Sequence, residues 1–393
     1  MKQLENIFRT HWLLFLCFWL GGMAPTKAQH AVNPMDSVEI GLLTCSPHDE
    51  VYSLYGHSAI HLRDYRDGTD IVFSYGVFNY NKPHFVLRFV FGLTDYELGV
   101  YHFSKFCKEY TRWNCKVTEQ VLNLTPDEKA RIANALFENA QPENRVYRYN
   151  FFYDNCSTRP RDIIEENVNG KVVYKPLSAE QQKTYRQFIH EHTKNNPWSA
   201  FGNDLLLGVR ADKKTTLREQ QFLPENLEND FKSATIEQDG YKRPLVKEEI
   251  VWYPLGTQPV GQASFPLSPL FCMFILLAIT IGVFAYEQYK KTCLQWFDAT
   301  LMLLTGLAGI ILFVMFFSEH PATSTNLQIL ILNPLSLFFI PTVLRRRKTR
   351  WFSISLCLTL LFLIGAFWQD YAEGMEVLAL CLLSRYLRHR YEK

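Results

Sequence analysis

Tyr55-Gly56-His57-Ser58-Ala59-Ile60-His61-Leu62 is the stretch that decides the fold of this 393-residue chain. In a strand the side chains alternate, so His57, Ala59 and His61 share one face. A second strand-like run, residues 71–75, follows the polar residues 64–70, which include Gly68. The two runs together predict an antiparallel hairpin.

Elements on both sides of this hairpin predict a domain of mixed α and β structure. Residues 38–43 are expected to form the first strand and residues 145–152 a later one. Helices are predicted where a capping box, or an Asp or Asn cap, precedes an apolar pattern. They run from Thr125 to about Ala140, from Asp154 or Asn155 to about Asn167, and from Ser178 to about Thr193. The aromatic segment 85–101 is interpreted as an insertion that faces lipid.

The N-terminus is predicted to be a secretory signal. Lys2 and Arg9 give it a positive start, and Thr26-Lys27-Ala28 is typical of a small-x-small cleavage site. The apolar stretch 12–23 is shorter than the roughly 20 residues that cross a bilayer as a helix. We therefore predict a signal peptide at residues 1–28, with an uncleaved anchor helix as the alternative.

The C-terminal third is predicted to span a membrane. Apolar runs cover residues 267–286, 297–317, 327–344, 352–367 and 374–387. Lys and Arg follow the first, third and fifth runs, whereas the connections at 318–326 and 369–373 contain neither. This alternation is what the positive-inside rule expects of five spans, although two short runs leave four as the alternative. The domain before the first span then lies outside the cytoplasm.

These assignments divide the mature chain into three parts. Residues 29–253 are the exported domain, residues 254–266 a linker rich in Gly and Pro, and residues 267–393 the transmembrane domain. The net charge is only +2, and the basic excess lies in connections predicted to face the cytoplasm. We therefore expect the membrane, and no nucleic acid, as a partner.

The cysteines of the predicted exported domain are Cys45, Cys107, Cys115 and Cys156. In an oxidising compartment Cys107 and Cys115 are candidates for a disulfide, and a pair of free thiols is the alternative. A CxxC pair is absent from the sequence, so no structural zinc or other metal is expected.

Cys156 and His57 are the candidate catalytic pair. A free thiol is mostly protonated near neutral pH, and only the thiolate attacks well. A helix that begins at Asp154-Asn155-Cys156 and a nearby imidazole would both lower the pKa of the thiol, although Pro160 weakens the first turn. The backbone N–H of Cys156 would then contribute to an oxyanion hole. A buried structural cysteine and an unrelated structural histidine are the alternative.

Two motifs resemble known enzymes. Gly56-His57-Ser58-Ala59-Ile60-His61-Leu62 is similar to the histidine strand of permuted papain-like proteins, the group of lecithin–retinol acyltransferase and NlpC-like relatives. Asn155-Cys156-Ser157-Thr158 is similar to the start of their catalytic helix. Over nearly the whole mature chain, the sequence resembles the Lnb family, described as lipoprotein N-acyltransferases. The motifs that carry this likeness are Tyr75-Gly76-Val77-Phe78, Leu122-Asn123-Leu124-Thr125, Asp154-Asn155-Cys156, Asn196-Pro197-Trp198, Phe222-Leu223-Pro224 and Asn333-Pro334-Leu335.

The resemblance implies a fold and a reaction. The expected fold is a permuted papain-like (NlpC-like) α+β domain in the bacterial periplasm, followed by an all-α bundle of five helices in the inner (cytoplasmic) membrane. Cys156 would be the nucleophile and His57 its base, with Ser74 or Tyr75 as the third, orienting residue and Tyr75 preferred. A fatty acyl chain would pass from a phospholipid to Cys156 as a thioester. It would then pass to the α-amine of the lipidated N-terminal cysteine of a lipoprotein, without a cofactor.

Substrate contacts are expected beside the nucleophile. Arg159 and Arg161 are candidates for binding a phospholipid phosphate through charge-assisted hydrogen bonds, with Asn155 as a further substrate-binding residue. An ion pair of these arginines with Asp162 or Glu165 is the alternative.

Two other functions compete with acyl transfer. A membrane-tethered thiol hydrolase acting on cell-wall peptide or amide bonds would use the same pair with water as acceptor. A membrane receptor or assembly factor would carry Cys156 as a structural residue.

Overall fold

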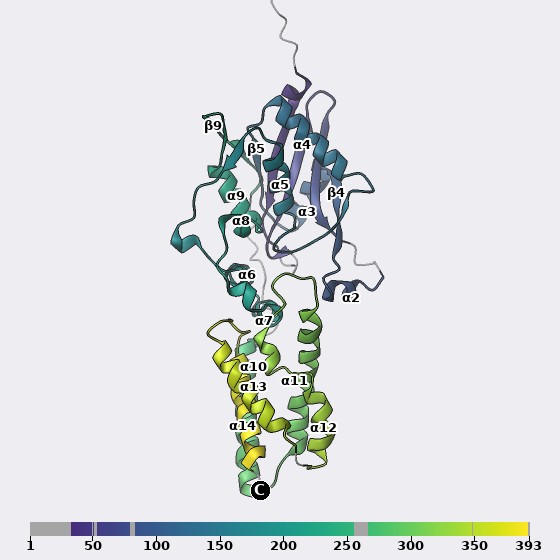
Figure 1. Ribbon diagram of the computed structural model, residues 1–393. Coiled ribbons are helices and arrows are strands. Elements are labelled where there is room, and N and C mark those ends of the chain that lie inside the picture. The colour runs from purple at the N-terminus through teal and green to yellow at the C-terminus, as the bar shows by residue number, and fades with distance from the viewer. Residues whose placement is uncertain are drawn as a thin grey trace, which may run out of the picture.

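The computed structural model describes residues 33–48, 50, 53–78, 83–254, 266–347 and 349–391. The predicted signal peptide lies outside the described residues, and so does most of the predicted linker. Figure 1 shows a sheet-rich part standing on one end of a bundle of helices. An α+β part followed by a helical part agrees with the expected fold class at that level.

The larger sheet has seven strands in the order β10-β5-β1-β2-β3-β4-β6, and all its pairings are antiparallel. The predicted hairpin is confirmed, because β2 pairs with β3 and places Ile60 opposite Phe73. A small second sheet has the order β7-β8-β9. The strands are β1 Val38–Cys45, β2 His57–Asp64, β3 Thr69–Val77, β4 Asp95–His102, β5 Val117–Leu122, β6 Val146–Arg148, β7 Lys171–Val173, β8 Thr235–Gln238, β9 Tyr241–Pro244 and β10 Val246–Tyr253.

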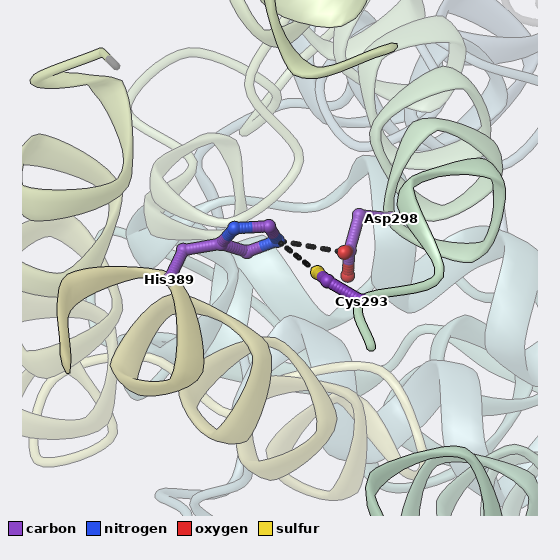
Figure 2. A group of neighbouring side chains, drawn as sticks. All are labelled: Cys293, Asp298 and His389. Carbon is purple, nitrogen blue, oxygen red and sulfur yellow. Dashed lines mark hydrogen bonds and ion pairs between the residues drawn. The ribbon is translucent and has the colours of Figure 1, made fainter. Parts of the chain in front are cut away.

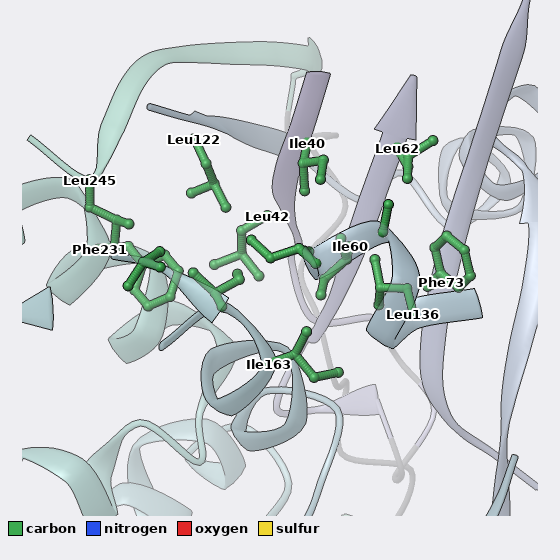
Figure 3. Close-up of a cluster of buried hydrophobic side chains, with 14 of the residues drawn as sticks. Ile40, Leu42, Ile60, Leu62, Phe73, Leu122, Leu136, Ile163, Phe231 and Leu245 are labelled. Carbon is green, nitrogen blue, oxygen red and sulfur yellow. The ribbon is translucent and has the colours of Figure 1, made fainter. Parts of the chain in front are cut away.

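The two faces of the large sheet bury different sets of side chains. On one face Ile60 and Phe73 pack with Leu136 of α4 (Pro126–Asn139) and Ile163 of α5 (Thr158–Asn167), as Figure 3 shows. On the other face Ala59 packs with residues of α3 (Phe103–Arg112). Since side chains alternate along a strand, His57 and His61 of β2 belong to the α3 face.

Local signals explain where most helices begin. The predicted capping box at Thr125 is confirmed, because Thr125 and Glu128 bond each other's backbone N–H at the start of α4. The prediction of one helix from Ser178 is wrong. Ser178 precedes only a short 3₁₀ turn, Ala179–Gln181, and Thr184 then caps a separate helix, α6. The other helices of this part are α2 Phe85–Val90, α6 Tyr185–Thr193, α7 Pro197–Leu206, α8 Leu217–Gln220 and α9 Pro224–Ser233.

The strand predicted at residues 145–152 is shorter than expected. Only β6, Val146–Arg148, joins the sheet. The side chain of Asn150 accepts hydrogen bonds from the backbone N–H groups of Phe152 and Tyr153, which turns the chain out of the strand.

The membrane part contains one α-helix that overlaps each of the five predicted runs. Two of them, α10 and α11, are long and apolar enough to cross a bilayer, and α13 is a shorter apolar helix. The third run is not one continuous helix, because Asn333 and Pro334 separate a 3₁₀ turn at Leu327–Leu330 from α12. The number of spans therefore stays a prediction. The helices are α10 Pro269–Lys290, α11 Gln295–Phe316, α12 Ser336–Leu344, α13 Trp351–Gly365 and α14 Met375–Tyr391.

Hydrogen bonds to the backbone fix the two parts to each other. Gly208 N–H donates to the carbonyl of Ala322 at 2.7 Å, and the side chain of Gln328 donates to the carbonyl of Asp204 at 2.8 Å. A Cβ atom at Gly208 would lie 2.6 Å from the carbonyl oxygen of Thr325, so only glycine allows this approach. The contact surrounds Arg186, whose side chain is fully buried between Asp204 and Asp212.

Arg186→Gln is expected to destabilise the protein by about 3–5 kcal/mol, because the buried Asp204 and the largely buried Asp212 both lose the guanidinium that pairs with them. Thermal unfolding of the full chain in detergent measures the change. Arg218→Gln is the matched control, since Arg218 also pairs with two carboxylates but is 55% exposed. That variant should stay within about 1 kcal/mol of wild type. Equal melting temperatures for the two variants would contradict the structural role given to Arg186.

Candidate active site

A tight turn held by Asn155 places Cys156 at the start of α5. The Asn155 side-chain oxygen accepts hydrogen bonds from the backbone N–H of Ser157 at 2.8 Å and of Thr158 at 3.0 Å. Its amide nitrogen donates to the carbonyls of Phe151 and Phe222. Asn155 is 1% exposed, so all its polar atoms serve the fold. The structure thus gives Asn155 a positioning role where the sequence suggested substrate binding.

The start of α5 lies against the start of β2. The hydroxyls of Ser157 and Ser58 are 3.1 Å apart, and the backbone N–H of Ser58 donates toward the Cys156 thiol. A Cβ atom at Gly76, on the neighbouring strand, would lie 3.8 Å from Cβ of Cys156. Ser58 directly follows His57, so the two motifs that the sequence singled out meet at this corner of the sheet.

His57 is held by Ser74. Its Nε2 lies 2.9 Å from the Ser74 hydroxyl oxygen, and its ring stacks on Tyr110 with centroids 6.2 Å apart. Burial lowers the pKa of His57 to about 4. The imidazole is therefore neutral near pH 7, and Ser74 is the polar group that fixes its orientation.

Tyr75 does not take the orienting role that was preferred for it. Its hydroxyl accepts a hydrogen bond from the Asn139 side chain at 3.1 Å, on the α4 face of the sheet. Ser74 and Tyr75 are adjacent in β3 and point to opposite faces, so only one of them can reach His57. The side chain on the face of His57 is that of Ser74.

The electrostatics of Cys156 differ from the expectation. Burial raises the pKa of its thiol, and hydrogen bonds from the backbone N–H of Ser58, the Ser157 hydroxyl and its own N–H lower it only in part. The helix start has little effect because the Asn155 side chain already takes the N–H groups of the first turn. The thiol and the imidazole are thus both neutral at rest.

Tyrosines surround the thiol. Burial raises the pKa values of Tyr149, Tyr147 and Tyr110. The negative charge that Cys156 carries when ionised raises them further, and at Tyr110 it comes after the charge of Cys45. The Tyr149 ring would lie 3.2 Å from a Cβ atom at Gly76, so this glycine leaves room for the ring beside Cys156. Sequence analysis did not identify these tyrosines, because they come from two separate segments of the chain that only the fold brings together.

The two arginines after Cys156 lie in different environments. Arg159 makes two hydrogen bonds with Asp154, at 2.6 and 2.8 Å, and its guanidinium lies 3.6 Å above the ring of Tyr147. Its side chain is 28% exposed. Arg161 is buried and bonds to Asp162 and to the carbonyl of Arg218. The structure therefore places Arg161 in the interior, as the alternative ion-pair interpretation held, and leaves Arg159 at the edge of the site.

Other reactive side chains of the sheet-rich part have structural partners. Cys107 and Cys115 are buried, and no disulfide joins them among the described residues. His61 is fully enclosed, with Glu119 at 2.8 Å and Asp70 at 2.7 Å. His61 therefore shares one face of β2 with His57, but both of its ring nitrogens are taken by carboxylates.

One group in the membrane part has the composition of a metal site. Figure 2 shows Cys293, Asp298 and His389, whose ligand atoms lie within 4.8 Å of one another. However, both oxygens of Asp298 accept hydrogen bonds from Arg385, which also pairs with Glu287. A guanidinium in that position opposes a second cation, so we interpret the group as an ion-pair network that holds α14 against α10 and α11.

Comparison with known families identifies the class of protein. Residues 26–191 match the family described as Lnb N-terminal periplasmic domain, and residues 261–393 match the one described as Lnb transmembrane domain. The two matches together span most of the chain, which therefore belongs to the Lnb family. It is a membrane protein with a periplasmic part, and its family suggests a membrane enzyme that processes lipoproteins. Neither a curated protein nor a solved structure matches the chain.

The resting thiol of Cys156 is expected to react slowly at neutral pH. Its raised pKa means that the thiolate fraction grows only above the ordinary value of 9.0. The rate of alkylation by iodoacetamide, followed on the peptide that contains Cys156, should therefore rise with a midpoint above pH 9. A midpoint below pH 7 would show a preformed ion pair with His57 and contradict the neutral pair.

Proposed function

We propose that this chain is a lipoprotein N-acyltransferase that carries the acyl group on Cys156. One observation supports it most: Cys156 lies beside the strand of His57, and Ser74 orients the imidazole. Membership of the Lnb family is the second support. The order of the elements, a histidine strand before a cysteine helix, also fits a permuted papain-like domain.

In the first step Cys156 attacks the ester carbonyl of a phospholipid. Since Nε2 of His57 bonds to Ser74, Nδ1 is the nitrogen left to accept the thiol proton. In the resting site the backbone N–H groups of Ser58 and Cys156 both donate toward the sulfur. We assign both groups to stabilise the oxyanion that forms on the carbonyl oxygen of the ester. The carbon–oxygen bond then breaks, His57 returns the proton to the leaving oxygen, and a lysophospholipid departs.

The neutral resting pair affects how this step occurs. Because the thiol pKa is raised and the imidazole pKa lowered, a full proton transfer before attack would be uphill. The proton therefore moves to His57 as the carbon–sulfur bond forms. A thiol that ionises only with a bound acyl ester is protected from other reactions in an oxidising compartment.

In the second step the α-amine of a lipidated N-terminal cysteine attacks the thioester. A carbon–nitrogen bond forms, the carbon–sulfur bond breaks, and the amine loses its proton through His57 to the departing sulfur. Tyrosine rings around the thioester exclude water, which favours the amine as acceptor. A hydrolase would need open access for water at this point, so acyl transfer is the better-supported of the two functions.

The membrane part supplies access to lipid-anchored substrates. A backbone carbonyl of α7 accepts a hydrogen bond from the loop between α11 and α12. Asn203 of α7 donates a hydrogen bond to the hydroxyl of Tyr55, two residues before His57. Arg159 at the edge of the site is the residue we propose for the phosphate of the donor, after exchange of its contact with Asp154.

The full chain, purified in detergent and mixed with phospholipid but no acceptor, is expected to gain the mass of one fatty acyl group. Intact-mass spectrometry measures the adduct, which should be absent from Cys156→Ser. His57→Ala should load at least about a hundredfold more slowly, the usual size of a general-base contribution. Wild-type protein that never acquires an acyl group from phospholipid would contradict the mechanism.

Neighbouring variants in β3 control this experiment. Ser74→Ala should slow the loading of Cys156, because the imidazole loses its orienting partner. Tyr75→Phe removes only a hydrogen bond with Asn139 on the other face and should load normally. A larger loss in Tyr75→Phe than in Ser74→Ala would reverse the assignment of the third residue.

A further inference from the structure

Helix α2 has the composition of a segment that contacts lipid. Of its residues, Phe85–Val90, only Arg88 is polar, and Phe91 follows directly. Leu87 is 59% exposed, Phe89 46% and Phe91 42%. Apolar helix surface is normally covered by protein or by a membrane, and in the described structure these three side chains are only partly covered.

The helix is fixed at the outer end of the membrane part. The carbonyls of Val90, Phe91 and Phe89 accept hydrogen bonds from Ser318, Glu319 and His320, which follow α11. A Cβ atom at Gly92 would lie 2.6 Å from the backbone nitrogen of His320, so glycine permits this close contact. Figure 1 shows α2 beside this end of α11, below the sheet.

Charged residues strengthen the same attachment. Arg148 of β6 pairs with Glu319, and it also pairs with Asp95, which Arg88 of α2 contacts as well. This chain of ion pairs ties α2 to both parts of the protein. Its apolar side chains are therefore held in one place and do not belong to a loose loop.

The apolar surface of α2 continues onto α11. Phe313, Phe316 and Phe317, at the end of α11 next to this attachment, are 50%, 50% and 64% exposed. α11 is one of the two helices long and apolar enough to cross a bilayer, so these aromatic side chains face its lipid. Because α2 is anchored at the same level as the end of α11, its apolar side chains contact lipid at the periplasmic side of the membrane as well.

A short connection leads from α2 to the catalytic centre. Thr94 follows α2 by four residues, and it bonds twice to Tyr149: its hydroxyl donates to the Tyr149 carbonyl at 2.6 Å, and its own carbonyl accepts from the Tyr149 N–H at 2.9 Å. Tyr149 is the ring beside Gly76 and Cys156. The lipid-facing helix thus borders the wall of the thiol site.

We propose that α2 is inserted into the periplasmic leaflet and binds the acyl chains of a phospholipid next to Cys156. Insertion follows from the exposed side chains and their attachment alone, whereas delivery of the acyl donor to Cys156 rests on the proposed function. Leu87, Phe89 and Phe91 contact the acyl chains, and the ester carbonyl lies toward Tyr149.

Photo-cross-linking tests the insertion. The full chain carrying Cys156→Ser is reconstituted in vesicles of phosphatidylethanolamine and phosphatidylglycerol that contain a phospholipid with a diazirine in its acyl chain. Peptides covering residues 83–94 should be labelled as well as peptides from α11. Labelling of α11 without labelling of 83–94 would overturn the proposal. The serine variant cannot accept an acyl group, so the result does not depend on acyl transfer.

A double variant, Leu87→Gln with Phe89→Gln, tests the delivery. Loading of Cys156 from vesicle phospholipid should fall at least about tenfold, which corresponds to about 1.4 kcal/mol, while loading from a water-soluble short-chain ester should not change. Phe137→Gln is the matched control, because Phe137 of α4 is also 46% exposed but lies remote from α10–α14. Wild-type loading from vesicles by the double variant would overturn delivery. Wild-type protein that cross-links through α2 but is never loaded would refute the acyl transfer and leave the insertion standing.

Discussion

The contact between the first turn of α5 and the first residues of β2 is the constraint on which the active site depends. Asn155 clamps the turn with four hydrogen bonds, and Ser157 meets Ser58 across the gap. Without this contact, the thiol and the imidazole would be distant residues on separate elements. The sheet supplies the remaining constraint, because Ser74 can reach His57 only if β2 and β3 keep their register.

Burial at this corner of the sheet lowers the reactivity of the resting site and makes the site more selective for its substrate. It holds both reactive groups in their neutral forms, so neither is a strong nucleophile or base at rest. A substrate that brings its own carbonyl to the N–H groups of Ser58 and Cys156 provides the stabilisation that the resting site lacks. In the mechanism we propose, the attached membrane bundle and helix α2 limit such substrates to those that arrive from the bilayer.

Several features could be predicted from the sequence because they depend on short-range patterns. The hairpin of β2 and β3 follows from alternation, and the start of α4 follows from the capping box at Thr125. The contact between the turn of Cys156 and the start of β2 was predicted only through the likeness to known families, since no local pattern brings residues so far apart together.

Other features depend on tertiary contacts that no local pattern contains. The choice between Ser74 and Tyr75 turned on which face of the sheet carries α3, and the burial of Arg161 turned on the position of Gln221 and Arg218. The expected low pKa of Cys156 failed because burial of the thiol raises it more than the nearby hydrogen bonds lower it. The third membrane run was predicted as one span from its apolar composition and the basic residues after it, yet the helix is interrupted at Pro334.

The mass of lipoprotein N-terminal peptides, from cells that lack this chain and regain either wild type or Cys156→Ser, tests the central claim most directly. Wild type should return peptides that are heavier by one fatty acyl group on the α-amine, and the serine variant should leave the amine free. Acylated peptides from cells that carry only the serine variant would contradict the account.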